Sequence, residues 1–76
     1  MEFEKLQSII AEVMSVDPEM ITMETRFTDD LGADSIDVLQ IIMGIEDAFE
    51  IEIPTEETEK IFTVGDAVEK IKNAIN

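Results

Sequence analysis

The 76-residue chain carries 19 Asp and Glu against 5 Lys and Arg, a formal net charge of −14 at pH 7, and it contains no His and no Cys. A chain of this length forms one domain, near the lower size limit for a single apolar core. The missing residue types exclude disulfides, thiolate nucleophiles, an imidazole base and ordinary zinc sites, and the negative charge disfavours nucleic acid and anionic lipid as partners.

The first predicted element is an amphipathic helix from about Glu2 to Ser15. Its apolar residues recur at offsets of 0, 3, 7 and 10, the spacing of one helical face: Phe3, Leu6, Ile10 and Val13. A long connection from Val16 to Asp34 follows, in which Asp17 and Pro18 predict a single helical turn. Such long connections are either functional or disordered. We expect a functional one, because three residues of buried type would anchor it: Ile21, Phe27 and Leu31.

The second predicted helix runs from Asp34 or Ser35 to Phe49, and either of the two candidate first residues is a good cap. At about 100° per residue its apolar side chains separate into two groups. The broader group predicts the core face: Val38, Ile41, Ile42, Ile45, Ala48 and Phe49. The narrower group lies on the opposite side and consists of Ile36, Leu39 and Met43, flanked by Gln40, Glu46 and Asp47.

The narrower group has two interpretations. In the plainer one the helix is buried on nearly all sides, which is geometrically hard in so small a domain. We favour the other, in which Ile36, Leu39 and Met43 form an exposed apolar strip, here called the docking strip, of the kind that binds partners. The acidic residues beside it would attract basic partners and raise association rates. The flexible Met side chain would let the surface fit partners of different shape.

A short connector and a short helix are predicted next. The residues 50–53 alternate like a strand, but they have no second strand to pair with and Pro54 follows them, so we expect an extended connector. Thr55 is the expected cap of the short helix, which leads to Ile61.

The last predicted helix begins at a sequence that resembles a capping box, Thr63 to Asp66, with Asp where Glu or Gln is usual. Its apolar residues fall at helical offsets: Val64, Ala67, Val68, Ile71 and Ile75. The chain is therefore predicted to be all-α, a four-helix bundle with three longer helices, one short helix and a long first loop.

The composition also indicates where this domain works. Hydrophobic residues make up 45% of the chain, unlike disordered acidic tails. No apolar run approaches the roughly 18 residues of a membrane span, and the start of the chain lacks the basic segment of a signal or transit peptide. We expect one cytoplasmic domain over residues 1–76, with no membrane insertion.

Ser35 stands at the junction of the long connection and the second helix. By residue type alone it is an N-cap. It is no self-activated nucleophile, because the chain has no His to act as its base and Asp34 and Asp37 are far too weak as bases. If Ser35 carries chemistry, another enzyme must modify it. A helix N-terminus would favour an attached phosphate electrostatically.

The segment Leu31-Gly32-Ala33-Asp34-Ser35-Ile36-Asp37 resembles the modification motif of acyl carrier proteins. The resemblance continues through Glu46-Asp47-Ala48-Phe49, Glu52-Ile53-Pro54 and the stretch from Glu59 to Ala67, and the early stretch from Ile9 to Phe27 also fits. Length, acidity and helix order agree with the four-helix bundle of that family. Two departures occur: Ile36 stands where Leu is most frequent, and Gln40 stands where many members carry an acid.

The resemblance implies a carrier and not an enzyme. Ser35, with Asp34 as its motif neighbour, would bear covalent 4'-phosphopantetheine, added from coenzyme A by a phosphopantetheinyl transferase. The arm would present acyl thioesters to fatty acid synthesis enzymes and acyltransferases, whose basic patches would bind the docking strip with Gln40, Glu46 and Asp47. By the same resemblance, the acyl chain would enter the bundle near Ile45, Ile53 and Ile61, for which ordinary core packing is the alternative.

We expect a monomeric carrier of the discrete kind used in fatty acid synthesis, and the alternative within the family is a carrier for a specialised acyl, polyketide or aminoacyl pathway. Three other classes of protein fit the sequence less well. A calcium-binding EF-hand needs an acid five residues before its Gly, and Phe27, Leu39 and Lys60 stand there instead. A plain acidic interaction domain would never gain a phosphopantetheine arm. Carboxylate pairs such as Asp29-Asp30 could serve an enzyme, but such runs are usually solvated. We expect no metal site.

Overall fold

The computed structural model describes residues 2–75, so Met1 and Asn76, the end residues of the predicted domain, lie outside the described residues. The elements in chain order are the helix α1 (Glu2–Met14), a 3₁₀ turn η1 (Pro18–Met20), and the helices α2 (Ser35–Phe49), α3 (Thr55–Thr58) and α4 (Val64–Ile75). Between residues 2 and 75 the chain forms no β-strand. The prediction of an all-α bundle with three longer helices, one short helix and a long first loop is confirmed.

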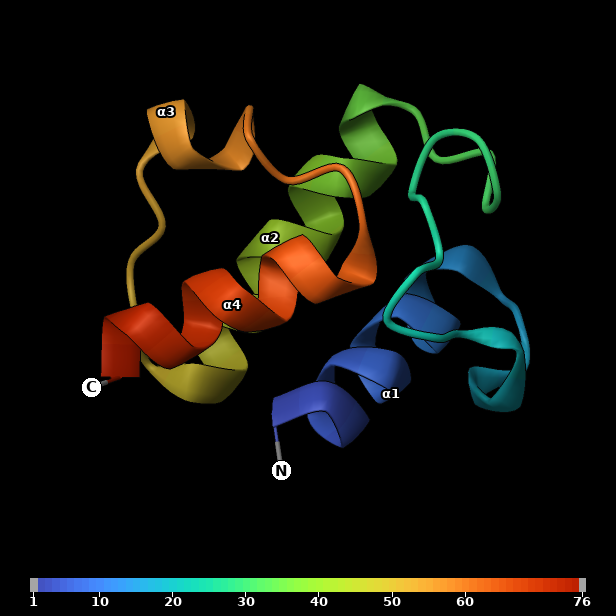
Figure 1. Cartoon of the computed structure of the whole chain (residues 1–76), viewed down its shortest axis with the longest axis horizontal. Helices are drawn as coiled ribbons and strands as arrows, with labels where there is room; N and C mark the ends of the chain where they lie inside the picture. The colour runs from blue at the N-terminus through green and yellow to red at the C-terminus, as the bar shows by residue number, and fades with distance from the viewer. Residues whose placement is uncertain (1, 76) are drawn as a thin grey trace.

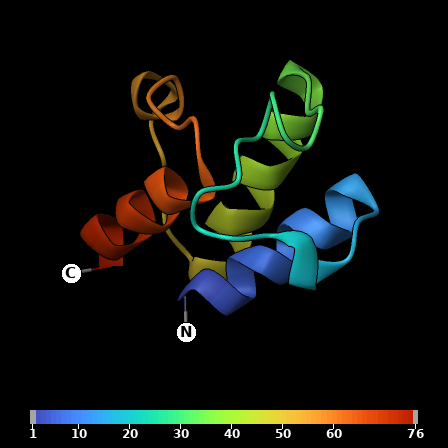
Figure 2. The ribbon, with the colours of Figure 1, turned by 45° about the vertical axis from the view of Figure 1, so that its right-hand side comes forward.

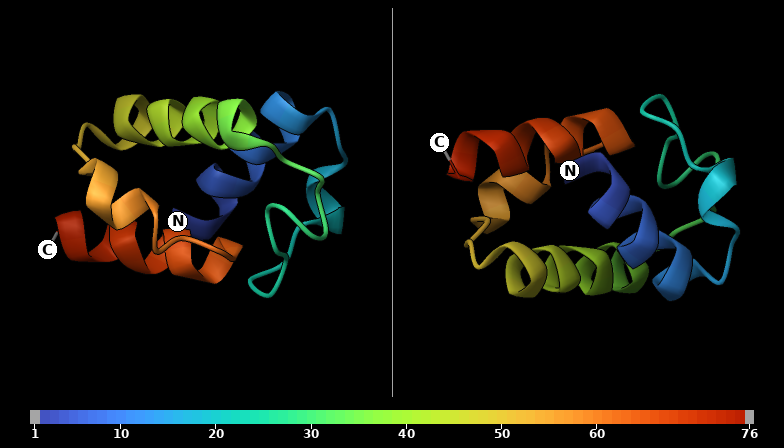
Figure 3. Two further views of the ribbon diagram at one scale, coloured as in Figure 1. Left: turned by 90° about the horizontal axis from the view of Figure 1, so that it is seen from above. Right: turned by 90° about the horizontal axis from the view of Figure 1, so that it is seen from below.

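The three long helices enclose one core. Helices α2 and α4 lie on two sides of the molecule, α1 runs between them on one face, and α3 spans them on the other (Figures 1 and 3). Each long helix supplies the apolar face that its periodicity predicts. The largest fully buried side chains come from all three and from the long first loop: Leu6, Ile10, Ile21, Ile41, Ile45, Val64 and Ile71.

Two details of the predicted helices are wrong. Ala48 is predicted to lie on the core face of α2, yet it is exposed. Thr55 was expected to cap α3, but Pro54 occupies the N-cap position and no side chain caps this helix. At the start of α4 the capping box is confirmed: the Asp66 N–H donates to Thr63 Oγ1 at 3.1 Å, and the Thr63 N–H donates to Asp66 Oδ2 at 3.1 Å.

The long first loop is bound to the link between α3 and α4. The Phe27 N–H donates to the Phe62 carbonyl at 3.1 Å, the Val64 N–H to the Thr25 carbonyl at 2.9 Å, and the Gly65 N–H to the Met23 carbonyl at 2.8 Å. Figure 2 shows the loop running from the end of α1 to the start of α2. This backbone pairing ties the middle of the loop to the α3–α4 link, and the last residues of the loop lead from there into α2.

Within residues 2–75, none of the helices combines the length and the apolar character that crossing a bilayer requires.

Candidate functional site

The site begins at the N-terminus of α2, where Asp34 and not Ser35 is the cap. Asp34 has extended backbone angles (φ −92°, ψ −176°), and its Oδ1 accepts the Asp37 N–H at 2.9 Å. Asp37 reciprocates, since its Oδ2 accepts the Asp34 N–H at 3.2 Å. Two N–H groups that a helix terminus leaves unpaired are thereby satisfied by two carboxylates.

Because Asp34 and Asp37 form this capping box, the Ser35 side chain does not cap α2. Ser35 is the first residue of α2 and is exposed. Among residues 2–75 its hydroxyl has no hydrogen-bond partner, because the role of cap is filled by Asp34. The residue type alone indicated a capping serine. The geometry instead presents an unengaged hydroxyl at a helix N-terminus, where the helix dipole favours an attached anion.

The end of the long loop holds this junction in position. Ala33 is buried, with 3% of its surface exposed, and its N–H donates to the Phe27 carbonyl at 2.9 Å. Gly32 precedes it with a positive φ of 69°, a backbone conformation that glycine adopts without strain. A buried anchor therefore stands two residues before Ser35, so the hydroxyl is set on a rigid support.

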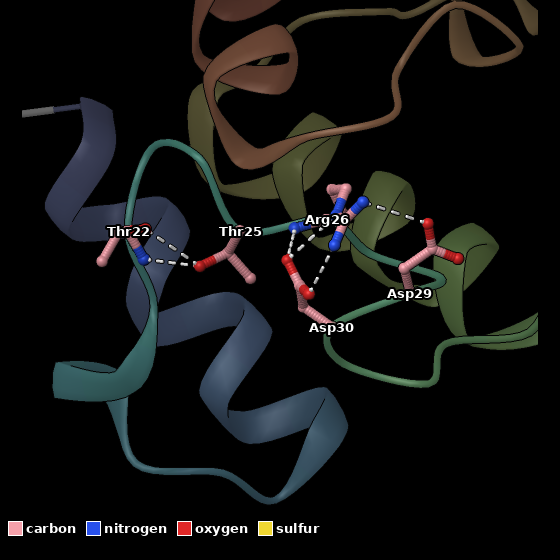
Figure 4. A network of polar contacts seen from close by, with 5 residues as sticks. All are labelled: Thr22, Thr25, Arg26, Asp29 and Asp30. Carbon is pink, nitrogen blue, oxygen red and sulfur yellow. Dashed lines mark hydrogen bonds and ion pairs between the residues drawn. The ribbon is translucent and has the colours of Figure 1, made fainter.

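A polar network stiffens the same loop (Figure 4). The Thr22 N–H donates to Thr25 Oγ1 at 2.8 Å. Asp30 Oδ2 accepts the Arg26 N–H at 2.8 Å, and the Arg26 guanidinium lies 3.3 Å from Asp30 Oδ1 and 3.5 Å from Asp29 Oδ2. The backbone N–H of Arg26 and then its side chain lower the pKa of Asp30, and the Asp30 carboxylate raises the pKa of Arg26.

A groove of about 500 Å³ opens beside Ser35. One wall comes from α2 and the end of the loop, and the other from Thr58 of α3 and the adjoining Glu59. The α2 wall is largely apolar: Val38, Leu39 and Ile42. A group attached to Ser35 therefore meets an apolar groove within one turn of its attachment point.

The predicted docking strip lies on the outer side of α2. Ile36 is 64% exposed, and Leu39 and Met43 are each 58% exposed. Gln40 and Asp47 beside them are also exposed. Glu46 differs, because its Oε2 accepts the Ile53 N–H at 2.8 Å and so ties the connector to α2. The chain has no Lys or Arg between Arg26 and Lys60, so every charge on α2 is negative.

The three residues predicted to line an acyl pocket are buried in the core: Ile45, Ile53 and Ile61. None of them lines the groove beside Ser35. Ile53 lines two other hollows, one between the connector and α4 and one between the connector and Glu46 of α2.

The sequence reasoning missed several residues of this region. Val38 and Ile42 were assigned to the core alone, although their helical positions one and two turns after Ser35 were a usable signal. Thr58 and Glu59 had no such signal, because they reach the groove only through the placement of α3. In the part of the chain that the structure describes, no three Asp or Glu side chains gather in a way that could hold a metal ion.

The chain is similar to known proteins in sequence and in overall structure. The chain matches a model of the phosphopantetheine attachment site over residues 4–71. It is 51% identical over 72 residues to an acyl carrier protein of Clostridium acetobutylicum, covering 95% of this chain and 94% of that protein. It is 54% identical over 69 residues to one of Clostridium perfringens, covering 91% of each. A solved structure of a proposed acyl carrier protein from Mycobacterium tuberculosis aligns with a TM-score of 0.91 at 32% identity, over 96% of this chain and 97% of that one.

Proposed function

The chain belongs to the acyl carrier proteins, and from that premise we propose that Ser35 is the residue that bears its 4'-phosphopantetheine arm. As a member of this family the protein carries acyl groups on phosphopantetheine, is not itself an enzyme, and interacts with a phosphopantetheinyl transferase and with fatty acid synthesis enzymes. The observation that carries the proposal is the free, exposed hydroxyl of Ser35 beside the Asp34 cap.

The residues around Ser35 fit the group. Its hydroxyl is exposed, has no partner among residues 2–75, and adjoins the apolar groove. In the transfer step the Ser35 oxygen bonds to the phosphorus of coenzyme A that bears the pantetheine. The phosphoanhydride bond breaks, adenosine 3',5'-bisphosphate leaves, and the hydroxyl proton passes to a base of the transferase. When bound, the arm supplies a terminal thiol that holds acyl groups as thioesters.

We propose that the groove beside Ser35 receives the first part of a bound acyl chain. Support comes from its apolar wall, formed by Val38, Leu39 and Ile42. Each buried methylene contributes about 0.8 kcal/mol, so a chain of several methylenes would prefer the groove to water. The buried residues Ile45, Ile53 and Ile61 stay a prediction for the deeper part of this path, because reaching them would require the core to open.

We propose that partner enzymes bind the docking strip through basic patches. The exposure of Ile36, Leu39 and Met43 and the absence of cations from α2 support this. Exposed Gln40 and Asp47 would contact the rim of a partner, whereas the Glu46 carboxylate is already engaged by Ile53. A net charge of −14 repels a second copy. We therefore propose a monomer, which works in the cytoplasm with the discrete enzymes of fatty acid synthesis.

Intact mass tests the attachment site. The protein is incubated with coenzyme A and a phosphopantetheinyl transferase of broad specificity, and we expect a gain of one phosphopantetheinyl group. Ser35→Ala should gain nothing. Ser8→Ala is the matched control, because Ser8 is also an exposed helical serine but lies on α1, and this variant should gain mass like the unaltered protein. A gain that persists in Ser35→Ala would overturn the assignment.

A further inference from the structure

The short helix α3 separates two hollows. On one side Thr58 and the adjoining Glu59 form a wall of the groove beside Ser35, which has a volume of about 500 Å³. On the other side Glu57 faces α4 across a smaller hollow of about 200 Å³, which Lys70 also lines. Figure 3 shows α3 between α2 and α4. Any shift of α3 toward α2 would therefore narrow the groove and widen the space on the α4 side.

Few contacts hold α3 where it is. None of its residues is buried. The chain is anchored on either side of it by Ile53, 8% exposed, and Ile61, 7% exposed. The backbone hydrogen bonds of residues 54–61 are all local, within one turn. The position of α3 between α2 and α4 therefore depends on its side-chain contacts to the long helices.

One side-chain pair makes this connection. Glu57 Oε1 lies 2.6 Å from Lys70 Nζ of α4, and within residues 2–75 this is the one hydrogen bond or ion pair that joins α3 to a long helix. The Glu57 side chain is 35% exposed and that of Lys70 is 26% exposed. Glu57 Oε2 also lies 3.4 Å from Lys60 Nζ, but Lys60 is 68% exposed and belongs to the same turn, so it ties α3 to nothing else.

We propose that the Glu57–Lys70 ion pair is a positioning element that holds α3 against α4 and so keeps the Ser35 groove wide enough for an acyl chain. This rests on the proposed function, in which the chain enters that groove. Without the pair, α3 is free to settle onto the apolar wall formed by half-buried Val38 and exposed Leu39, because burial of the exposed part of that wall is favourable. The groove then admits less of the acyl chain, and the thioester spends more time in water.

The test measures how well the bound chain shields its thioester. Protein loaded with acetyl or with octanoyl phosphopantetheine is treated with hydroxylamine, which attacks the thioester carbonyl and releases the arm's thiol and a hydroxamate. The ratio of the octanoyl to the acetyl cleavage rate reports shielding, because an acetyl group has no methylenes to bury in the groove. In the unaltered protein we expect octanoyl to be cleaved several times more slowly than acetyl.

Lys70→Met keeps the length of the side chain and removes its charge. We expect it to raise the octanoyl-to-acetyl ratio about threefold. Lys60→Met is the matched control, since it removes the other lysine from the same carboxylate, and its ratio should stay at that of the unaltered protein. The charge-swapped pair Glu57→Lys with Lys70→Glu should restore slow octanoyl cleavage. If Lys70 acted through its own packing and not through the ion pair, the charge swap would not restore slow octanoyl cleavage.

The outcomes separate this inference from the proposed function. If Ser35 is not loaded, or if octanoyl and acetyl are cleaved equally fast in the unaltered protein, the attachment site or the groove is wrong. If the unaltered protein shields the octanoyl thioester and Lys70→Met shields it equally well, the ion pair does not determine the width of the groove. The same conclusion follows if Lys60→Met raises the octanoyl-to-acetyl ratio as much as Lys70→Met does. It also follows if the charge-swapped protein loses octanoyl as fast as Lys70→Met.

Discussion

Ile9 Cγ2 of α1 lies 2.9 Å from the position that a Cβ atom on Gly44 of α2 would occupy. Real Cβ contacts are not this short, and the neighbouring atom is on a β-branched side chain with little freedom to move. Gly44 therefore permits the close approach of α1 and α2 that closes the core behind the docking strip.

The first prediction is that Gly44→Ala lowers the free energy of unfolding by about 1 kcal/mol. Overpacking costs typically 1–3 kcal/mol, and the better helix propensity of Ala returns up to about 1 kcal/mol. Urea denaturation measures the difference. In the background of Ile9→Ala, which removes the methyl group that would collide, the same Gly44→Ala change should become neutral or stabilising. An equal loss in both backgrounds would contradict the packing explanation.

The second prediction concerns the cap of α2. Asp34→Ala should lower the free energy of unfolding by about 1 kcal/mol, because it removes the acceptor for the Asp37 N–H. Asp34→Asn keeps an acceptor oxygen and should stay within about 0.5 kcal/mol of the unaltered protein. Asp47→Ala, at an exposed acid of the same helix, is the control and should have little effect. If all three variants are equally stable, Asp34 is not the functional cap.

The third prediction tests the docking strip. Met43→Glu should lower kcat/KM of a fatty acid synthesis ketosynthase for the acyl-loaded protein about tenfold, because a carboxylate would be placed against an apolar partner surface. Stability should change by less than about 0.5 kcal/mol, since Met43 is 58% exposed. Met20→Glu makes the same substitution in η1, away from α2, and should leave turnover unchanged. Strong destabilisation by Met43→Glu would assign this residue to the core instead.

The fourth prediction is a pH dependence at the start of α4. The backbone N–H groups of Phe62 and then Thr63 lower the pKa of Asp66 below its usual 3.8. A lowered folded-state pKa stabilises the fold above the unfolded pKa, and this contribution is lost as the pH falls through the folded pKa. Asp66→Asn should therefore be destabilised at pH 7 and at pH 5, and the difference should shrink as the pH falls below 3.8 and through the lowered pKa of Asp66 in the folded protein. Urea midpoints of both proteins at each pH measure it, and a difference that does not depend on pH would refute the electrostatic cause.

The fifth prediction follows from the net charge of −14. Mutual repulsion of carboxylates destabilises the compact state, and at 0.1 M ionic strength charges more than about 10 Å apart are largely screened. The melting temperature should rise with added sodium chloride and with divalent cations. The double variant Glu52→Gln with Glu56→Gln removes two exposed acids, so it should melt higher at low salt and respond less to salt. A flat response of the unaltered protein would show that repulsion is unimportant.

Much of the fold could be predicted because it depends on local patterns. The spacing of apolar residues located α1, α2 and α4, and the sequence from Thr63 to Asp66 located a cap that depends on side chains three residues apart. The choice between Asp34 and Ser35 as the cap of α2 could not be made, because both residue types suit the position and the outcome depends on the backbone angles of residue 34.

The long-range contacts could not be predicted. The backbone pairing of Thr25 with Val64 joins segments almost 40 residues apart through groups that every residue possesses. Glu57 and Lys70 are separated by 13 residues and lie on different elements, so no helical spacing connects them. The groove wall at Thr58 has the same origin, since its place beside Ser35 depends on how α3 is held.

The two faces of α2 differ in how well they tolerate substitutions during evolution. Ile41 and Ile45 are packed against other helices, so most changes there reduce stability and are removed by selection. Ile36, Leu39 and Met43 contact mainly solvent in the free protein, so substitutions there leave the fold nearly unaffected. The range of enzymes that recognise this carrier is therefore open to change by single mutations, including in laboratory evolution, without prior gains in stability.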